Sequence, residues 1–316
     1  MWKFHPERPE GYPDDLMLYR NETPIQSIID QSDLTKDITD ESIRFIEENK
    51  DNQFFLYIAH PQPHVPLFAS KDFNGSTGNG LFADVISEID FSVGRVIEAL
   101  EKHNLTENTI VVFTSDNGPW LSYGDHAGSS GIYREGKGTA WEGGQRVPCI
   151  IKYPKEIKAK TIIDEPVMGI DWMPTFSHIT GSKLSTNKID GKNIWPLLTQ
   201  KENKSPHKEL YFYYRQNELH AVRSGDWKLY FPRSYRTLNG KPGGKDGIPV
   251  KYENNIVRSN ELYNLKEDPS ETTNVYSEYI EKAKELEKMG ENARQELGDA
   301  LTSRVGIGVR KIGSID

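Results

Sequence analysis

TIVVFTSDNGPW (residues 109–120) and GIYREGKGTAWEGGQRVP (residues 131–148) are the stretches that decide the fold. In the first, a β-branched apolar run predicts a buried strand, which ends directly at Asp116 and Asn117. In the second, glycines flank Lys137, and a Glu-Gly-Gly sequence follows at Glu142. Carboxylate and amide oxygens at a strand end suit a hard cation, and a lysine held by glycines suits an anion. Together they predict a metal-assisted site for a doubly charged ester such as a sulfate or phosphate.

Each half of this pattern also fits a plain structural interpretation. Asp-Asn-Gly is common in turns, where asparagine and aspartate bond to their own backbone. A glycine-rich loop that carries a lysine is, by itself, weak evidence for an anion site. Glu142 and Arg146 are spaced so that a buried ion pair beneath the loop is expected, and such a pair would be structural.

Three histidines are candidates for the same site. His64 follows an apolar run at 54–59 and lies among prolines, which hold a side chain stiffly, as a catalytic donor requires. The alternative is a surface histidine in a proline-rich loop. His126 lies in the glycine-rich loop and is expected to line a substrate pocket, and His60 is a weaker candidate.

Two further features are interpreted as structural. Cys149, the single cysteine, lies in an apolar run at 147–151 and is expected to be a buried small hydrophobe. Asp14 and Asp15 follow Tyr12-Pro13 and are expected to form a solvated turn, not a metal pair.

Composition limits the possible partners. The net charge of −8 argues against nucleic acid, which normally requires a basic face. No apolar run approaches the length of about eighteen residues that a membrane span requires. The first residues show no apolar signal-peptide region, and a lone cysteine leaves the redox compartment open.

Periodicity predicts an α/β layer with a largely parallel sheet, followed by a smaller subdomain. We expect a first domain at 1–200 and a C-terminal subdomain at 201–316, joined by a polar linker at 199–208. In the first domain, residues 1–33 are expected to be irregular, helices are expected at 35–49, 81–103 and 171–179, and strands at 54–59, 110–114 and 147–153. In the subdomain, antiparallel strands are expected at 210–214, 220–224, 227–231 and 261–265, a loop at 236–251 and a charged helix at 277–297.

The order and spacing of these pieces resemble the sulfatases of the alkaline phosphatase superfamily, of the arylsulfatase A and N-acetylgalactosamine-6-sulfatase type. The resemblance extends from about Phe54 onward. It is carried by FFLYIAHPQPHVPLFAS, DVISEIDFSVGRVIEAL, TIVVFTSDNGPW, REGKGTAWEGGQRVPCIIKYP, GIDWMPTF, AVRSGDWKLYF and ELYNLKEDPSETTNV.

The resemblance implies a role for each candidate residue. Asp116 and Asn117 resemble the second pair of calcium ligands, and Lys137 resembles the lysine that grips the sulfate ester. His64 resembles the histidine near the leaving-group oxygen, which it would help to neutralise or protonate. The implied fold is the C-terminal part of a sulfatase-type mixed, mainly parallel sheet flanked by helices, plus a small α+β subdomain with an antiparallel sheet. The implied reaction is hydrolysis of a sulfate ester, expected on a sugar, in a periplasmic, extracellular or lysosomal setting for the full-length family.

This sequence departs from the family pattern in its first part. It has no strand ending in two metal-binding aspartates and no Cys/Ser-x-Pro/Ala-x-Arg motif, whose first residue becomes the formylglycine nucleophile. We therefore expect a C-terminal portion of a sulfatase that binds calcium poorly, has an unprotected sheet edge and is almost inactive alone, with the missing N-terminal part as its partner. A phosphodiesterase or phosphonate hydrolase of the same superfamily, and a non-catalytic protein that binds sulfated glycans, are the alternatives.

Overall fold

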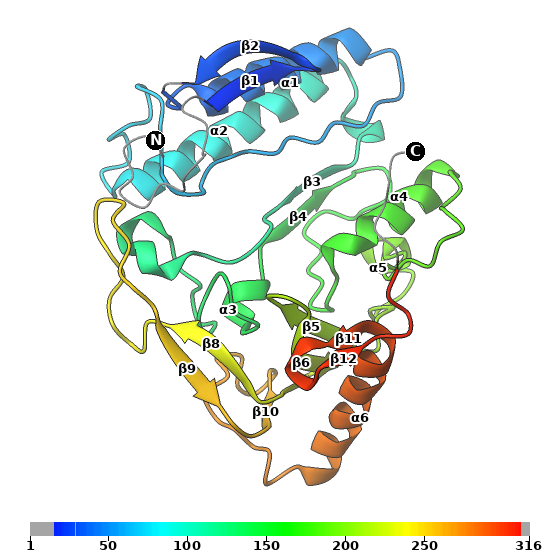
Figure 1. Ribbon diagram of the computed structural model, residues 1–316. Coiled ribbons are helices and arrows are strands. Elements are labelled where there is room, and N and C mark those ends of the chain that lie inside the picture. Colours follow the sequence, from blue (N-terminus) through cyan, green and yellow to red (C-terminus); the bar gives the residue numbers. More distant parts are fainter. Residues whose placement is uncertain (1–15, 29, 311–316) are drawn as a thin grey trace. The chain divides into compact units, whose positions relative to one another are not determined.

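The structure is a computed structural model that describes residues 16–28 and 30–310 (Figure 1). The chain divides into two compact units, Met1–Thr106 and Glu107–Asp316. The division expected at residue 200 remains a prediction.

The first unit begins with a hairpin where an irregular segment was expected. Strands β1 (Leu16–Arg20) and β2 (Thr23–Ile28) pair antiparallel around a turn at Asn21, whose φ of 54° asparagine tolerates better than most residues. Proline at position 24 hid this strand, because proline normally argues against one. Asp14 and Asp15 lie outside the described residues.

Two helices form the body of the first unit, and both confirm the predicted periodicity. Helix α1 (Leu34–Asn49) packs against α2 (Leu81–Lys102), with an ion pair of 2.6 Å between Arg95 and Asp40. On the buried side of α2, the Asp84 carboxylate accepts hydrogen bonds from the backbone N–H groups of Gly75 and Thr77. The Asp84 side chain therefore holds the loop before α2 against the start of the helix.

The predicted strand at 54–59 does not form a ladder. Its backbone is extended, and the side chains of Phe55 and Tyr57 are 73% and 79% exposed. The apolar residues favour an extended chain, but a strand also needs a neighbour for its N–H and C=O groups. No strand among the described residues pairs with this segment.

In the second unit, the strands that flank the opening motif pair with each other. Strand β3 (Val111–Thr114) runs antiparallel to β4 (Cys149–Lys152), and Phe113 lies opposite Ile150. Every ladder among the described residues is antiparallel, so the parallel pairing that we expected is not found there. The physical reason is the connection: the chain returns beside β3 through an irregular loop and not through a crossover helix.

One face of the β3–β4 ladder is covered and the other is exposed. Ile151 packs against a cluster around Trp195 that includes side chains of helix α4 (Trp172–Thr180) and α5 (Trp195–Leu198). On the opposite face, Phe113 and Ile150 are 37% and 65% exposed. Cys149 is also exposed, contrary to the expectation of burial, because it lies at the end of β4 beyond the cluster.

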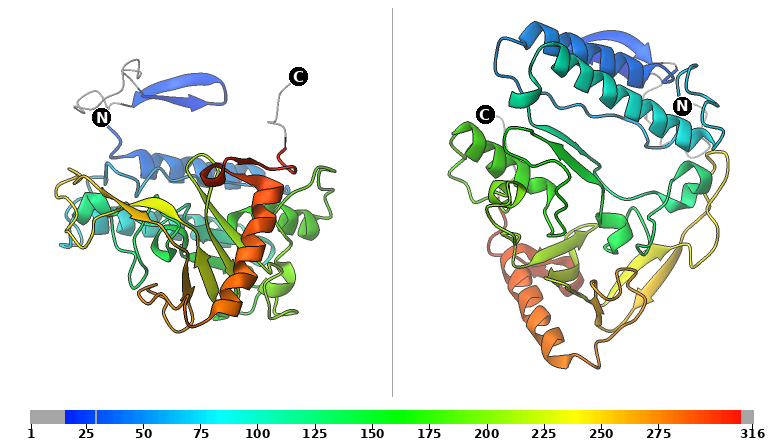
Figure 2. Two further views of the ribbon diagram at one scale, coloured as in Figure 1. Left: turned by 60° about the horizontal axis from the view of Figure 1, so that its bottom comes forward. Right: turned by 180° about the vertical axis from the view of Figure 1, so that it is seen from behind.

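The predicted meander is confirmed as a four-stranded antiparallel sheet in the order β10-β7-β6-β5. Helix α6 (Ile280–Leu297) lies on this sheet and buries Leu286 against Leu229 and Leu262 (Figure 2). Ile280 is 39% exposed at the first turn of the helix. The strands are β5 (Leu210–Tyr214), β6 (Glu218–Ser224), β7 (Trp227–Tyr230) and β10 (Glu261–Asn264).

Two strands bound the predicted loop at 236–251. Strand β8 (Arg233–Thr237) pairs antiparallel with β9 (Glu253–Val257), so the loop itself covers only the residues between them. Along β8 the buried positions are Arg233, Tyr235 and Thr237. A sequence with charge at a buried position hides the alternation of apolar and polar residues by which a strand is recognised.

The remaining elements are short. They are η2 (Thr106–Asn108), η3 (Leu121–His126), α3 (Glu142–Gln145), η4 (Gly169–Asp171), β11 (Gly298–Asp299), η5 (Ala300–Thr302) and β12 (Arg304–Val305). Among the described helices, none combines the length and the apolar character needed to cross a bilayer.

Candidate functional site

The two halves of the opening motif are joined through their backbones. The Lys137 N–H donates to the Pro119 carbonyl over 2.8 Å, and the Gly118 N–H donates to the Gly144 carbonyl over 3.1 Å. These bonds lie on either side of the glycine-rich loop. The segment after β3, which carries the candidate metal ligands, is therefore held directly against the loop that carries the candidate anion ligand.

Glycine is required at this junction because backbone packs on backbone. A Cβ atom added at Gly118 would lie 1.8 Å from the Gly143 carbonyl oxygen, and one at Gly143 would lie 2.2 Å from the Glu135 oxygen. One at Gly136 would lie 2.3 Å from the Pro119 oxygen. Carbon and oxygen cannot approach so closely, so any side chain would push the two segments apart.

The Lys137 side chain lies beside an aromatic ring. Its Nζ atom is 5.2 Å from the centroid of Trp120, within the range of a cation–π contact. Among the described residues, no carboxylate forms an ion pair with this ammonium group. The charge therefore remains available to an anion.

Arg236 of β8 holds the loop from the other side, and sequence reasoning missed it. Its Nε donates to the Lys137 carbonyl over 3.0 Å, and its Nη2 donates to the same oxygen. Gly138 has a φ of 85°, and a Cβ there would lie 2.3 Å from the guanidinium. The guanidinium thus occupies the space that the missing side chain leaves.

The loop between β8 and β9 rests on η3. The Ser122 carbonyl accepts from the N–H groups of Gly244 (2.9 Å) and Val250 (3.0 Å). The Ser122 N–H donates to the Tyr252 hydroxyl over 3.1 Å. His126 lies at the end of η3, near Gly247, and its buried Nδ1 has no hydrogen-bond partner among the described residues. The structure therefore brings these two loops into contact.

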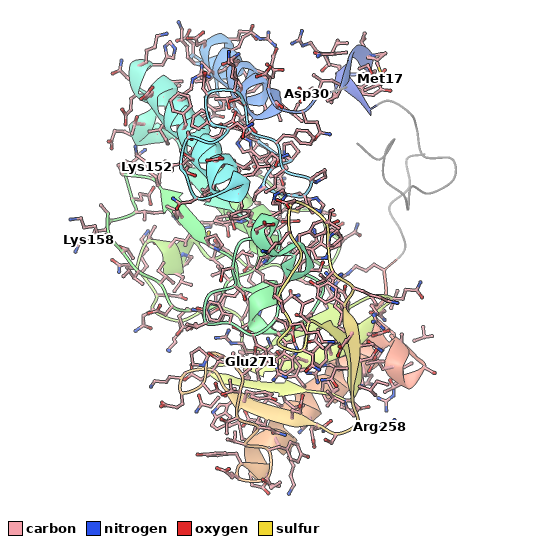
Figure 3. The ribbon with its side chains drawn as sticks, turned by 90° about the vertical axis from the view of Figure 1, so that its left-hand side faces the viewer. Met17, Asp30, Lys152, Lys158, Arg258 and Glu271 are labelled. Atoms are coloured by element: carbon pink, nitrogen blue, oxygen red, sulfur yellow. The ribbon has the colours of Figure 1, made fainter. Side chains whose placement is uncertain are left out.

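A buried group of charges lies beneath the glycine-rich loop. The Lys228 ammonium of β7 is fully buried and donates to Glu142 over 2.7 Å and to the Ala140 carbonyl over 2.8 Å. Glu271, labelled in Figure 3, lies 3.6 Å from the same ammonium and accepts from the Tyr230 hydroxyl. Its carboxylate also accepts from the Glu142 N–H over 2.8 Å.

This arrangement corrects the expected Glu142–Arg146 pair. Glu142 is buried as expected, but its partners are Lys228 and Arg223 from the C-terminal sheet, the latter at 3.4 Å. The Arg146 guanidinium instead lies over the Tyr133 ring at 4.7 Å. The loop is therefore fastened to a distant part of the chain through the cations of the sheet.

The two buried carboxyl groups respond differently to the shared cation. Burial raises the pKa of Glu142, but the positive charges of Lys228, Arg223 and Arg146 together outweigh it, so the net pKa lies below the ordinary 4.5. Burial also raises the pKa of Glu271, and there the attraction of Lys228 does not offset it. The nearby negative charge of Glu142 adds to that increase.

Asp116 and Asn117 do not by themselves fit a calcium ion. Asp116 is exposed at the strand end, and the Ser115 hydroxyl donates to the Asn117 carbonyl over 3.2 Å. Calcium takes about six to eight oxygen ligands. Across residues 16–28 and 30–310, no three acidic, histidine or cysteine side chains gather in a group suited to a metal ion. The donor chemistry is suitable, but the number of donors is too small.

His64 belongs to the first unit, where it is exposed and its Nδ1 lies 2.7 Å from the Val65 carbonyl. The His64 N–H donates to the Pro61 carbonyl over 3.2 Å, so the local backbone is fixed by more than its prolines. His60 is half-buried, and burial lowers its pKa below the ordinary 6.5. In the second unit, the segment of Asp116 and Asn117 and the loop of Lys137 are joined by backbone hydrogen bonds.

Comparison with known proteins places these features in a family. The family model described as sulfatase matches residues 5–182, and the model described as the C-terminal region of aryl-sulfatase matches residues 205–306. The first match includes the strand-end motif and the glycine-rich loop. The second includes the sheet that supplies Arg236 and Lys228.

Individual relatives agree with this assignment. The chain is 37% identical to human steryl-sulfatase over 74% of its own length and 42% of that protein. It is 34% identical to the arylsulfatase of Hemicentrotus pulcherrimus over 83% of its own length and 50% of that protein. It therefore spans about half the length of these curated relatives.

A solved structure, that of Ps i-CgsB in complex with k-i-k-neocarrahexaose, matches with a TM-score of 0.71 at 28% identity. The match covers 92% of this chain and 60% of that one, and it supports the predicted mixed α/β class. The helices and antiparallel ladders described above agree with that class. The chain belongs to the sulfatase family.

Proposed function

We propose that this chain supplies part of the active site of a sulfuric ester hydrolase. The observation that carries the proposal is the direct bond between the Lys137 N–H and the Pro119 carbonyl. Through it, the backbone of Lys137, whose ammonium group suits a sulfate ester, is held against the segment that carries the oxygen-bearing residues Asp116 and Asn117.

In this proposal each residue has a distinct role. The Lys137 ammonium binds the sulfate oxygens, and its charge offsets the negative charge that the ester carries into the transition state. His64 stabilises or protonates the departing oxygen as a hydrogen-bond donor. His126, with its buried Nδ1 directed to no protein acceptor or donor among the described residues, lines the substrate pocket.

We propose a sulfated sugar as the substrate. The side chains around Lys137 are the aromatic ring of Trp120 and the guanidinium of Arg236, which suit the faces and charged groups of a sulfated sugar. The match to a protein solved in complex with k-i-k-neocarrahexaose supports this class. The match to a steryl-sulfatase favours a sterol instead, but a sterol would need an aliphatic wall that these residues do not provide.

We further propose that turnover requires another polypeptide segment. The 316 residues contain no Cys/Ser-x-Pro/Ala-x-Arg motif, so the formylglycine nucleophile must come from elsewhere. The same segment would supply the additional oxygen ligands that a calcium ion needs around Asp116 and Asn117. The exposed pair of Phe113 and Ile150 on the β3–β4 ladder offers an apolar surface to such a segment.

The chain alone is expected to hydrolyse 4-methylumbelliferyl sulfate about 10⁶-fold more slowly than an intact sulfatase, because it lacks the nucleophile. Adding a polypeptide that carries the formylglycine motif and its flanking strands should restore turnover. Lys137→Met should abolish the restored activity, whereas the exposed Lys266→Met should retain it. Release of 4-methylumbelliferone, followed by fluorescence, measures each rate.

Other outcomes of this assay would support the alternatives. Ordinary sulfatase rates from the chain alone would contradict the need for a second segment. Turnover of a phosphodiester or a phosphonate monoester, but of no sulfate ester, would indicate the related hydrolases. Binding of a sulfated sugar that His64→Ala and Lys137→Ala weaken, without turnover even after complementation, would indicate a binding protein.

Calcium binding by the chain alone is expected to be weak, with a Kd above about 1 mM, because Asp116 and Asn117 provide few of the oxygens required. Isothermal titration with CaCl₂ at constant ionic strength measures the affinity. Asp116→Asn should leave the small heats unchanged. A micromolar Kd that Asp116→Asn removes would show that a complete calcium site exists within this chain.

A further inference from the structure

We propose that Arg236, which lies over the Trp120 ring, forms a second anion subsite beside Lys137. This subsite selects sulfate esters that carry a further anionic group on the same small carrier. The proposal rests on the function proposed above for Lys137. It adds a substrate class, because a site with one cation binds any sulfate ester, whereas a site with two cations prefers a dianionic carrier.

The geometry places both cations around one ring. The Lys137 Nζ lies 5.2 Å from the Trp120 centroid, and the Arg236 guanidinium carbon lies 5.5 Å from the same point. The two charges can therefore be no farther apart than the sum of these distances. A monosaccharide with anionic groups on two of its carbons spans a comparable length.

The charge of Arg236 is not neutralised by the protein. Its Nε and Nη2 donate to the Lys137 carbonyl, and its Nη1 has no hydrogen-bond partner among the described residues. Among the described residues, no carboxylate forms an ion pair with the Arg236 guanidinium. A guanidinium is always charged and has five N–H donors, so this one retains donors for a ligand.

The subsite is also held rigidly. The Arg236 guanidinium lies over the Tyr252 ring at 4.7 Å, and the Tyr252 hydroxyl accepts from the Ser122 N–H. Next along β8, the Thr237 hydroxyl donates to Glu135 over 2.6 Å. Burial raises the pKa of Glu135, with the Thr237 hydrogen bond acting against it, so this carboxyl group is poorly suited to neutralise the neighbouring cations. Rigid donors bind an anion with little loss of side-chain entropy.

The test compares two probes, galactose 6-sulfate and galactose 2,6-disulfate, whose Kd values are measured by isothermal titration with the full chain at low salt. We expect the wild type to prefer the disulfate by about tenfold, the effect of one charge-assisted hydrogen bond. Arg236→Gln retains a donor for the Lys137 carbonyl but removes the charge, and should eliminate the preference. Arg236→Lys retains the charge without the fork and should give an intermediate ratio.

The ratio of the two Kd values separates this proposal from simpler explanations. If Arg236 only positions Lys137, Arg236→Gln will weaken both probes equally and leave the ratio unchanged, which overturns the subsite. Arg215→Gln removes a positive charge from an exposed turn of the same unit, and it should preserve the ratio unless the preference is a general charge effect. Failure of the wild type to bind either probe would overturn the Lys137 site itself, and equal binding of both probes would overturn only the subsite.

Discussion

Lys228→Met is expected to lower the free energy of unfolding by about 3–5 kcal/mol at pH 7, because it leaves two buried carboxylates without their cation. Methionine fills a similar volume, so the loss reflects charge and not a cavity. The Glu142 carboxylate would lose its 2.7 Å partner, and Glu271 would lose the only ammonium near it among the described residues. Equilibrium urea unfolding, followed by tryptophan fluorescence, measures the change.

The pH dependence gives this prediction a second test. In the wild type, Glu142 has a lowered pKa, so its stabilising effect is present above pH 4.5 and is lost as the pH falls through its folded-state value. In the variant, both carboxyl groups should have raised pKa values, and protonation at low pH then favours the folded state. The difference between the two proteins should therefore narrow as the pH falls below about 5.

Two controls accompany Lys228→Met. The exposed Lys266→Met should change the stability by less than about 0.5 kcal/mol, as is usual for surface substitutions. The triple variant Lys228→Met, Glu142→Gln and Glu271→Gln should recover much of the loss, since no unpaired buried charge remains. A loss below about 1 kcal/mol in the single variant would contradict the proposed role of the buried cation.

Gly118→Ala is expected to destabilise the second unit by about 3 kcal/mol, at the upper end of the range for overpacking. The added methyl group would lie 1.8 Å from the Gly143 oxygen and 2.9 Å from the Gly143 carbonyl carbon, which are backbone atoms and cannot rotate away. Relief requires the segment after β3 to move from the loop. The bond between the Gly118 N–H and the Gly144 carbonyl should break, and binding of a sulfated sugar should weaken with it.

Gly94→Ala is the matched control for this substitution. Gly94 lies inside α2, and a Cβ atom there would meet no atom within 4 Å. Alanine at this position should stabilise the chain by about 0.5–1 kcal/mol, because alanine favours the helix over glycine. If Gly118→Ala unfolds at the same urea concentration as the wild type and binds the same ligands, the close contact between the two segments is wrong.

Much of the fold could be predicted from sequence because its main elements have regular apolar patterns. Helix α2 has apolar side chains at helical spacing over its whole length, and β3 is a β-branched run between turns. Strand β8 lacks such a pattern, because Arg233 is buried against the Tyr230 ring and paired with Glu261 at 3.1 Å. From sequence alone, a buried arginine is taken for a surface residue, because the sequence does not show its partners.

For the candidate site, the sequence offers residues with suitable chemistry but not all of their contacts. Asp116 and Lys137 carry recognisable chemistry within short motifs, so their roles could be proposed. Arg236 could not be found, because it is 99 residues from Lys137 and bonds to a backbone carbonyl that any residue would offer. The extended segment at 54–59 shows the opposite failure, because its composition indicates a preference for strand but contains no information about a partner.

The attachment of the glycine-rich loop to the C-terminal sheet limits how members of this family can exchange parts. The loop and its anchors, Arg236 and Lys228, lie in segments matched by two different family models. A chimera that takes residues 107–200 from this chain and the rest from a relative should keep an ordered loop only if that relative has cations at both anchor positions. We therefore expect recombinant sulfatases to fold when both segments, the loop and the sheet that anchors it, come from the same parent. The two family regions should accordingly evolve together.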